Sequence, residues 1–348
     1  MDLAVAARGQ TSLDPPLPRA RGPLSGHLLD HLVGPMHAMP PFPVNVEPGE
    51  EALTGDDFHL ALYVCYELHY RGFADVDPAW EWEPSLLALR RALEAAFEAS
   101  LRAESPRSVP ADVEAELVEL ISGDGPSLSG YMADHGTCAQ FEEFAIHRSA
   151  YQLKEADPHT WGIPRLSGGP KSAMVLIQAD EYGDGVAGES HAELFADTMA
   201  AFGLDPTYGA YLDLLPGSTL ATVNLVSMFG LHRRFRGALV GHLAIFEMTS
   251  VGPMGRYSRA TRRLGLPASA GRFYDVHVEA DVVHGMVASS RMAGGLARQD
   301  PDLAPDIIFG ARALMAVESR FAGHLLDSWD KGVTSLRTLA PSPALARR

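Results

Sequence analysis

Cysteine is scarce in this sequence: only Cys65 and Cys138 occur among 348 residues. Two cysteines exclude a disulfide framework and a zinc site built from thiolates, because each needs more sulfur atoms. Hydrophobic runs are also short, and no stretch reaches the roughly 18 apolar residues that a membrane-spanning helix needs. The N-terminus lacks the apolar segment of a secretory signal peptide. We therefore expect a cytoplasmic protein with no membrane partner.

Positive charge is in the minority. The chain carries 28 Lys and Arg residues against 44 Asp and Glu residues, which gives a formal net charge of −16. Because nucleic-acid binding relies on a basic surface that neutralises phosphates, this balance argues against a nucleic-acid partner. Histidine, by contrast, is plentiful, with 14 residues. A composition poor in cysteine but rich in carboxylates and histidine suits a site for iron or manganese.

The chain divides into two terminal segments and a helical middle. Residues 1–50 are rich in Pro, Gly and Arg, so a flexible arm is expected there, and 336–348 is expected to form a flexible tail. Strand-like alternation is scarce, so we predict an all-α fold, with N-terminal accessory helices over 51–136 and a core over 137–335. Helical periodicity and helix-end residues predict helices over 56–72, 84–97 and onward, 110–122, 126–134, 137–155, 171–183, 188–203, 206–214, 218–229, 230–250, 268–288 and 304–330.

The clearest local pattern is formed by His277, Asp281 and His284, which stand at positions i, i+4 and i+7. At about 100° per residue, these three side chains project from one face of a helix. One helix would then aim two imidazoles and a carboxylate at a single point, which is a ligand set suited to iron. Asp275 and Glu279 fall on the opposite face, toward solvent. The alternative interpretation is a polar helix stripe or a surface His–Asp pair.

Three glycines, Gly183, Gly185 and Gly188, match the G-x-G-x-x-G pattern of a dinucleotide-binding loop. That role needs backbone amides that approach a pyrophosphate, and the acidic residues around these glycines would repel one. No strand–helix alternation follows them either. We interpret the glycines as a break between two helices, which present Glu181 and His191 from the two pieces.

Glu247 lies in a strongly apolar segment, between Phe246 and Met248. A lone carboxylate is costly to bury there without a partner, and metal ligation would supply that partner. The alternative interpretation is an exposed position near the end of a helix.

Two further polar groups have open interpretations. Glu143 and His147, at i and i+4, could form a rival ligand pair, or they could belong to a polar helix face or line a substrate pocket. The basic run over 232–236 could meet a substrate carboxylate, with a solvated helix face or a subunit contact as the alternative.

Taken together, these motifs resemble the haem-oxygenase-like di-iron oxidase family, often called iron-containing redox enzymes. In that family a carboxylate and a histidine come early in the core, a lone glutamate follows on a middle helix, and a His-x3-Asp-x2-His helix comes last. Here Glu247 matches the middle glutamate, thirty residues before the last motif. Glu181 and His191 match the first pair, with Glu189 as the fallback carboxylate. The likeness covers roughly residues 50–335 and includes the stretches 66–73, 147–159 and 229–234.

The resemblance implies a haem-oxygenase-like bundle of about seven core helices, here with extra N-terminal helices. Members reduce dioxygen at two irons and oxidise small amines, amino acids or fatty acids. We therefore expect an oxidoreductase whose partners are a small-molecule substrate and dioxygen, with a homodimer as the working hypothesis. No catalytic residue beyond the metal ligands and no organic cofactor is expected. The resemblance implies that two Fe(II) ions per chain are bound by Glu181, His191, Glu247, His277, Asp281 and His284.

Other interpretations predict different chemistry. The chain could be a helical binding protein whose metal site is vestigial or structural, and it would then bind little iron and consume no dioxygen. Haem oxygenase shares the fold but uses one proximal histidine, and thiaminase-like relatives rely on a catalytic cysteine, for which Cys65 and Cys138 are the candidates. Ferritin-like di-iron proteins use Glu-x-x-His pairs, and the absence of any such pair here counts against that fold.

Overall fold

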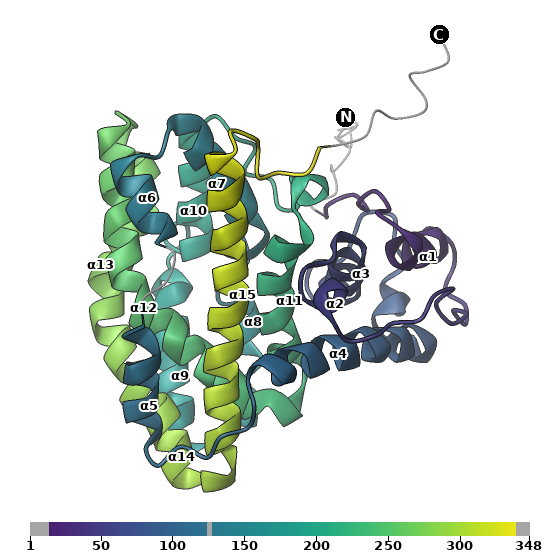
Figure 1. Ribbon diagram of the computed structural model, residues 1–348, viewed down its shortest axis with the longest axis horizontal. Helices are drawn as coiled ribbons and strands as arrows, with labels where there is room; N and C mark the ends of the chain where they lie inside the picture. Colours follow the sequence, from purple (N-terminus) through teal and green to yellow (C-terminus); the bar gives the residue numbers. More distant parts are fainter. Residues whose placement is uncertain (1–13, 124–126, 339–348) are drawn as a thin grey trace, which may run out of the picture.

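The computed structural model describes residues 14–123 and 127–338. Within these ranges all regular secondary structure is helical, which confirms the predicted all-α class. A large helical bundle forms one side of the molecule, and a smaller group of N-terminal helices packs against it (Figure 1). Within the described ranges, we find no helix that combines the length and the apolar composition of a membrane-spanning segment.

The smaller group contains four helices: α1 (Pro23–Leu32), α2 (Glu50–Thr54), α3 (Asp56–Glu67) and α4 (Pro84–Glu104). The expected flexible arm over 1–50 differs from the structure after residue 14, because α1 packs against α3. Leu24, Leu28 and Leu32 recur every four residues and are buried on one face of α1. The carboxylate of Asp57 accepts hydrogen bonds from the backbone N–H groups of Leu24 and Ser25, each at 2.8 Å, and so stabilises the start of α1.

The large bundle is built mainly from the helices that follow residue 137, with α5 and α6 packed on its outside. The elements are α5 (Val113–Ile121), α6 (Leu128–Asp134), α7 (Cys138–Gln152), α8 (Asp157–Thr160), α9 (Gly168–Glu181), α10 (His191–Ala201), α11 (Gly217–Leu231), α12 (Arg236–Arg263), α13 (Ala268–Met286), a π-helical segment (Val287–Gly294), α14 (Gly295–Gln299) and α15 (Ala304–Asp330).

Glycines allow α12 and α15 to approach each other closely at the centre of the bundle. A Cβ atom at Gly241 would collide with the backbone of Ile307, and one at Gly310 would collide with the backbone of Ala238. With no side chain at either position, the two backbones come into direct contact. The arrangement fixes the separation of α12 from α15.

Two of the predicted helices differ most from the observed ones. The helix expected over 206–214 is replaced by turns and a short 3-10 segment, Leu212–Leu214, because Gly209 adopts a left-handed φ of 77° that interrupts a helix. The helix expected over 230–250 instead starts at Arg236 and continues through Pro253 to Arg263. The packing of α12 against α13 and α15 outweighs the backbone hydrogen bond that Pro253 cannot donate.

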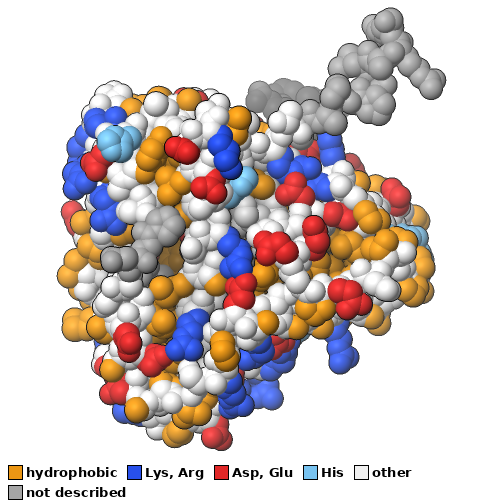
Figure 2. All heavy atoms as spheres, viewed as in Figure 1, with side chains coloured by type: hydrophobic (Ala, Val, Ile, Leu, Met, Phe, Trp, Pro, Cys, Tyr) orange, Lys and Arg blue, Asp and Glu red, His pale blue; other side chains and the backbone are white. Residues whose placement is uncertain are grey.

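In the view of Figure 2, acidic and basic side chains alternate across the face rather than gathering by sign. Many charged side chains of the described residues form ion pairs, such as Arg320–Glu104 and Arg148–Glu318.

Candidate metal centre

Seven buried carboxylate and imidazole side chains converge inside the bundle. Their ligand atoms fall into two groups, and the atoms of each group lie within 4.8 Å of one another. The first group comprises Glu155, Glu181, His191 and His277, and the second comprises Glu181, Glu247, Asp281 and His284. Glu181 belongs to both groups. The structure thus brings together all six residues predicted from the sequence, and it adds Glu155.

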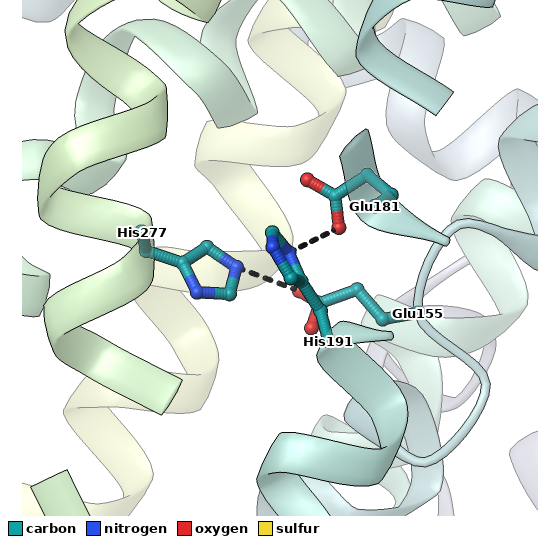
Figure 3. A group of neighbouring side chains, drawn as sticks. All are labelled: Glu155, Glu181, His191 and His277. Atoms are coloured by element: carbon teal, nitrogen blue, oxygen red, sulfur yellow. Dashed lines mark ion pairs between the residues drawn. The ribbon is translucent and has the colours of Figure 1, made fainter. Parts of the chain in front are cut away.

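Glu181 and His191 face each other from two consecutive helices. Glu181 is the last residue of α9 and His191 the first of α10, and the turn between them contains the glycines described above. Ser190 and Glu193 form a capping box that starts α10. The Nδ1 atom of His191 lies 2.7 Å from Oε2 of Glu181 (Figure 3). Glu189, the fallback carboxylate, lies outside the cluster and pairs with Arg272 at the surface.

Helix α13 presents its three candidate ligands on one buried face, as the spacing predicted. His277, Asp281 and His284 are all buried, whereas Glu279 is exposed. The Nδ1 atom of His277 lies 2.8 Å from the carbonyl oxygen of Phe273. Because a carbonyl can only accept, Nδ1 carries the hydrogen and Nε2 is free for a metal. This Nε2 atom lies 3.8 Å from Oε1 of Glu155 (Figure 3).

The imidazole of His284 is placed between carboxylates of three elements. Its Nδ1 atom lies 3.4 Å from Oδ1 of Asp281 and 3.6 Å from Oε2 of Glu247 on α12. On the other side of the ring, Nε2 lies 3.4 Å from Oδ2 of Asp180 on α9. A carboxylate that faces the far nitrogen of a ligating histidine orients the ring and increases its basicity. Asp180 has this place, and the sequence alone did not indicate it.

Glu155 comes from the connector between α7 and α8, which was predicted as the end of a helix over 137–155. Helix α7 ends at Gln152, and the chain then turns. Ala156 adopts a left-handed φ of 74°, which takes the chain out of the helical direction just after Glu155. Glu155 is buried and faces His277. No periodic spacing connects it with another ligand, so only the flanking Asp157-Pro158 helix stop hinted at a change of direction.

Several polar atoms of the cluster are buried and have no hydrogen-bond partner. They are Oε2 of Glu155, Oε2 of Glu181, Nδ1 of His191, both carboxylate oxygens of Asp281 and Nδ1 of His284. The close pair formed by Glu181 and His191 is not aligned as a hydrogen bond, which leaves both of its atoms unsatisfied. Each such atom costs about 1–3 kcal/mol when it is left unpaired. Bound cations would satisfy them, and carboxylate and imidazole donors suit iron, so these residues fit a pair of iron ions.

Burial shifts the protonation of the cluster. It raises the pKa of Glu181 to about 7 and that of Glu247 to about 8, because a buried carboxylate is poorly solvated. Burial lowers the pKa of His277 and His284, but nearby carboxylates outweigh it and raise both values to about 10. Burial and the positive charge of His277 lower the pKa of His191 to about 4. Without metal, protons therefore balance part of the negative charge.

We expect the protein to release at least about two protons per chain when it binds metal at pH 7. His277 and His284, each with a pKa of about 10, are protonated at this pH, and a ligating imidazole must be neutral. Proton release also means that the apparent metal affinity rises with pH. The measurement is an anaerobic Fe(II) titration in weak buffer with a pH-indicator dye. The number of protons released per chain should be lower in His284→Ala, because this variant lacks one of the two protonated imidazoles. Binding of iron with no proton release would contradict this description of the metal-free cluster.

Several of the candidate ligands line a small cavity. Besides candidate ligands, the cavity is lined by Tyr151, Ala156, His159, Gln178, Leu243, Phe246 and Ser250. Cys65 is buried in α3 and Cys138 is exposed at the start of α7, and neither is among the lining residues. The cavity therefore provides no thiol for thiaminase-like chemistry.

The rival polar groups have structural partners elsewhere. Nδ1 of His147 lies 2.7 Å from the hydroxyl oxygen of Thr219, and Nε2 lies 3.0 Å from that of Ser335. Glu143 accepts hydrogen bonds from the backbone and the hydroxyl of Ser335. This pair therefore holds the segment after α15 and is not part of the cluster. The basic run over 232–236 forms ion pairs with acidic residues of the same chain.

Known proteins are similar to parts of this chain. Nitrosourea synthase from Streptomyces achromogenes subsp. streptozoticus is 25% identical over 159 residues. The match spans 45% of this chain but only 34% of that protein. A CADD-like protein of unknown function from Nostoc punctiforme PCC 73102 aligns over 66% of this chain and 97% of its own, with a TM-score of 0.49 and 14% identity.

A family model covers the whole ligand cluster. The match runs over residues 142–319, slightly more than half of the 348 residues. All seven buried candidates, from Glu155 to His284, fall inside this range. The match also confirms the resemblance that the motifs indicated. The chain therefore belongs to the iron-containing redox enzyme family.

Proposed function

We propose that this chain is a non-haem di-iron oxidoreductase that uses dioxygen to oxidise a small organic substrate. The observation that carries the proposal is Glu181, a buried carboxylate shared by two groups of four candidate ligands. A carboxylate has two oxygen atoms and can bridge two cations, as in other di-iron sites of helical bundles. A single structural metal would need only one of the groups.

Each iron would have its own ligands in addition to the shared carboxylate. Glu155, His191 and His277 would hold one ion, and Glu247, Asp281 and His284 would hold the other. When bound, iron supplies the redox chemistry that reduces dioxygen. Six of the seven ligands come from four helices, α9, α10, α12 and α13, which favours a site whose geometry is set before metal arrives.

The chain's own residues would orient the ligands and the substrate. The carbonyl of Phe273 and the carboxylate of Asp180 restrict the rotation of His277 and His284. The apolar side chains of Leu243 and Phe246 line the cavity and limit water near the metal ligands, which strengthens electrostatic interactions there. A substrate in this cavity would therefore contact a largely apolar surface.

One polar group that lines the cavity, the side-chain amide of Gln178, has an unused hydrogen-bond acceptor. The amide nitrogen of Gln178 donates hydrogen bonds to the carbonyl of Ala156 at 2.8 Å and to the hydroxyl oxygen of Thr160 at 2.7 Å. These two bonds fix the orientation of the amide and leave its buried Oε1 atom without a partner. A substrate N–H or O–H group could bind there. The relative named nitrosourea synthase forms a nitrogen compound, so amines and amino acids are the first substrates to test.

The proposal is tested by loading the metal-free protein with Fe(II) in the absence of oxygen. After desalting, we expect about two irons per chain by elemental analysis, and oxygen consumption when air is admitted. His277→Ala should lower the iron content without lowering helicity by circular dichroism, because it removes one ligand. Glu279→Ala, an exposed position on the same helix, is the matched control. Iron that is bound without any oxygen consumption would instead support a structural metal site.

A further inference from the structure

The connector that carries Glu155 is attached to the N-terminal helices by a buried ion pair. Nζ of Lys154 lies 2.8 Å from Oε2 of Glu67, at the end of α3. Lys154 is 2% exposed and Glu67 is 0% exposed. The hydroxyl of Tyr208 also donates a hydrogen bond to this oxygen, at 2.7 Å. Adjacent residues of the connector thus have partners on different sides: Lys154 binds α3, and Glu155 faces His277 of the metal cluster.

The backbone of the connector is held at both of its ends. A guanidinium nitrogen of Arg71 lies 3.3 Å from the carbonyl oxygen of Leu153 and donates to it. At the other end, Gln178 donates to the carbonyl of Ala156, the residue with a φ of 74°. A left-handed conformation at an alanine costs about 1–2 kcal/mol, so it persists only where the surroundings enforce it. The direction of Glu155 is therefore a product of tertiary contacts.

The ammonium group of Lys154 has little freedom to move. It lies 4.3 Å from the centre of the Tyr70 ring and 4.9 Å from that of Tyr63, which adds cation–π attraction to the ion pair. A buried charge that loses its partner is strongly destabilising, so either member of the ion pair fixes the other. With its ammonium group held in this way, Lys154 restricts the movement of the backbone that carries Glu155.

We propose that the Glu67–Lys154 ion pair positions Glu155 as a metal ligand and so sets the affinity of the first ligand group. The inference rests on the proposed function, because it assumes that the cluster binds metal. Glu67 lies outside the family-matched residues 142–319, so a helix outside that region would govern metal binding inside it. Lys154 and Glu67 are positioning residues and do not touch the metal or the substrate.

The test compares iron binding in two variants. Lys154→Met removes the ammonium group and keeps most of the side-chain volume, and Lys154→Met/Glu67→Met removes both charges. We expect both variants to bind the iron of the first group about 10- to 100-fold more weakly, the usual effect of losing an outer partner of a metal ligand. In anaerobic titrations with Fe(II) alone, they should hold about one iron at concentrations where the wild type holds about two. The second group lacks Glu155 and should be unaffected.

Thermal unfolding separates positioning from general stability. The double variant has no unpaired buried charge, so we expect its metal-free Tm to return toward that of the wild type while its iron affinity stays low. Phe97→Leu, in the buried face of α4, is the control that lowers stability at a distance, and it should keep two irons. Wild-type affinity in the double variant would overturn the inference. Failure of the wild type itself to bind two irons would instead refute the proposed function.

Discussion

Replacing Glu181 by alanine should abolish the binding of both iron ions, because this carboxylate is the only residue common to the two ligand groups. Loss of an outer partner of a ligand already weakens metal binding 10- to 100-fold, so we expect loss of the shared ligand to cost at least about 100-fold at each site. Oxygen consumption should fall to the level of the metal-free protein. Elemental analysis after anaerobic loading measures the first effect, and an oxygen electrode measures the second.

The same substitution should not destabilise the metal-free protein. The pKa of Glu181 is raised to about 7 in the folded state, so its ionisation opposes folding once the pH exceeds the ordinary pKa of a glutamate. Above pH 7 the folded wild type carries the full free-energy cost of ionising this buried carboxylate, and the alanine variant does not. We therefore expect a metal-free Tm at pH 8 that equals or exceeds that of the metal-free wild type. The Tm of the iron-loaded wild type should be higher than either, because bound metal stabilises the fold.

Glu189→Ala provides the matched control for this prediction. Glu189 was the fallback for the first carboxylate, but its side chain is 44% exposed and pairs with Arg272. Its removal should leave both irons in place. Loss of iron in Glu189→Ala together with its retention in Glu181→Ala would reverse the assignment of the ligand.

Replacing Glu155 by alanine should remove one iron and leave the other. The second group of four ligands does not include Glu155, so it stays complete. We expect about one iron per chain after anaerobic loading, and a loss of oxygen consumption comparable with that of Glu181→Ala, because the proposed reaction needs both metals. Glu279→Ala is again the control. Full iron content in the Glu155 variant would show that the residue is not a ligand, and loss of both irons would show that the groups bind cooperatively.

The ligands that could be predicted are those whose geometry is local. His277, Asp281 and His284 lie on one helix, so the helical repeat alone places them on one face, and the structure buries all three. Glu247 was indicated by its apolar neighbours, since a carboxylate buried there needs a partner. The family resemblance related these residues to Glu181 and His191, which no spacing rule connects with α13.

Glu155 and Asp180 could not be predicted because their positions depend on distant contacts. The direction of Glu155 follows from the left-handed turn at Ala156 and from contacts with α3, whose residues precede it by more than eighty positions. Helix α1 was missed for a related reason. Its leucine repeat lies within a Pro- and Gly-rich segment, and it becomes helical where α3 covers the apolar face and Asp57 binds the helix start.

The close contact between α12 and α15 limits which substitutions the metal centre tolerates. Glu247 lies on α12, six residues after Gly241. At Gly241 the backbone of α12 contacts that of α15. Even one methyl group at Gly241 or Gly310 would push the two helices apart and shift the carboxylate of Glu247 relative to the ligands of the other helices. The accuracy of the iron-binding geometry therefore depends on two glycines that are not themselves candidate ligands. A sequence change at either position would act on metal binding through the contact between the two helices.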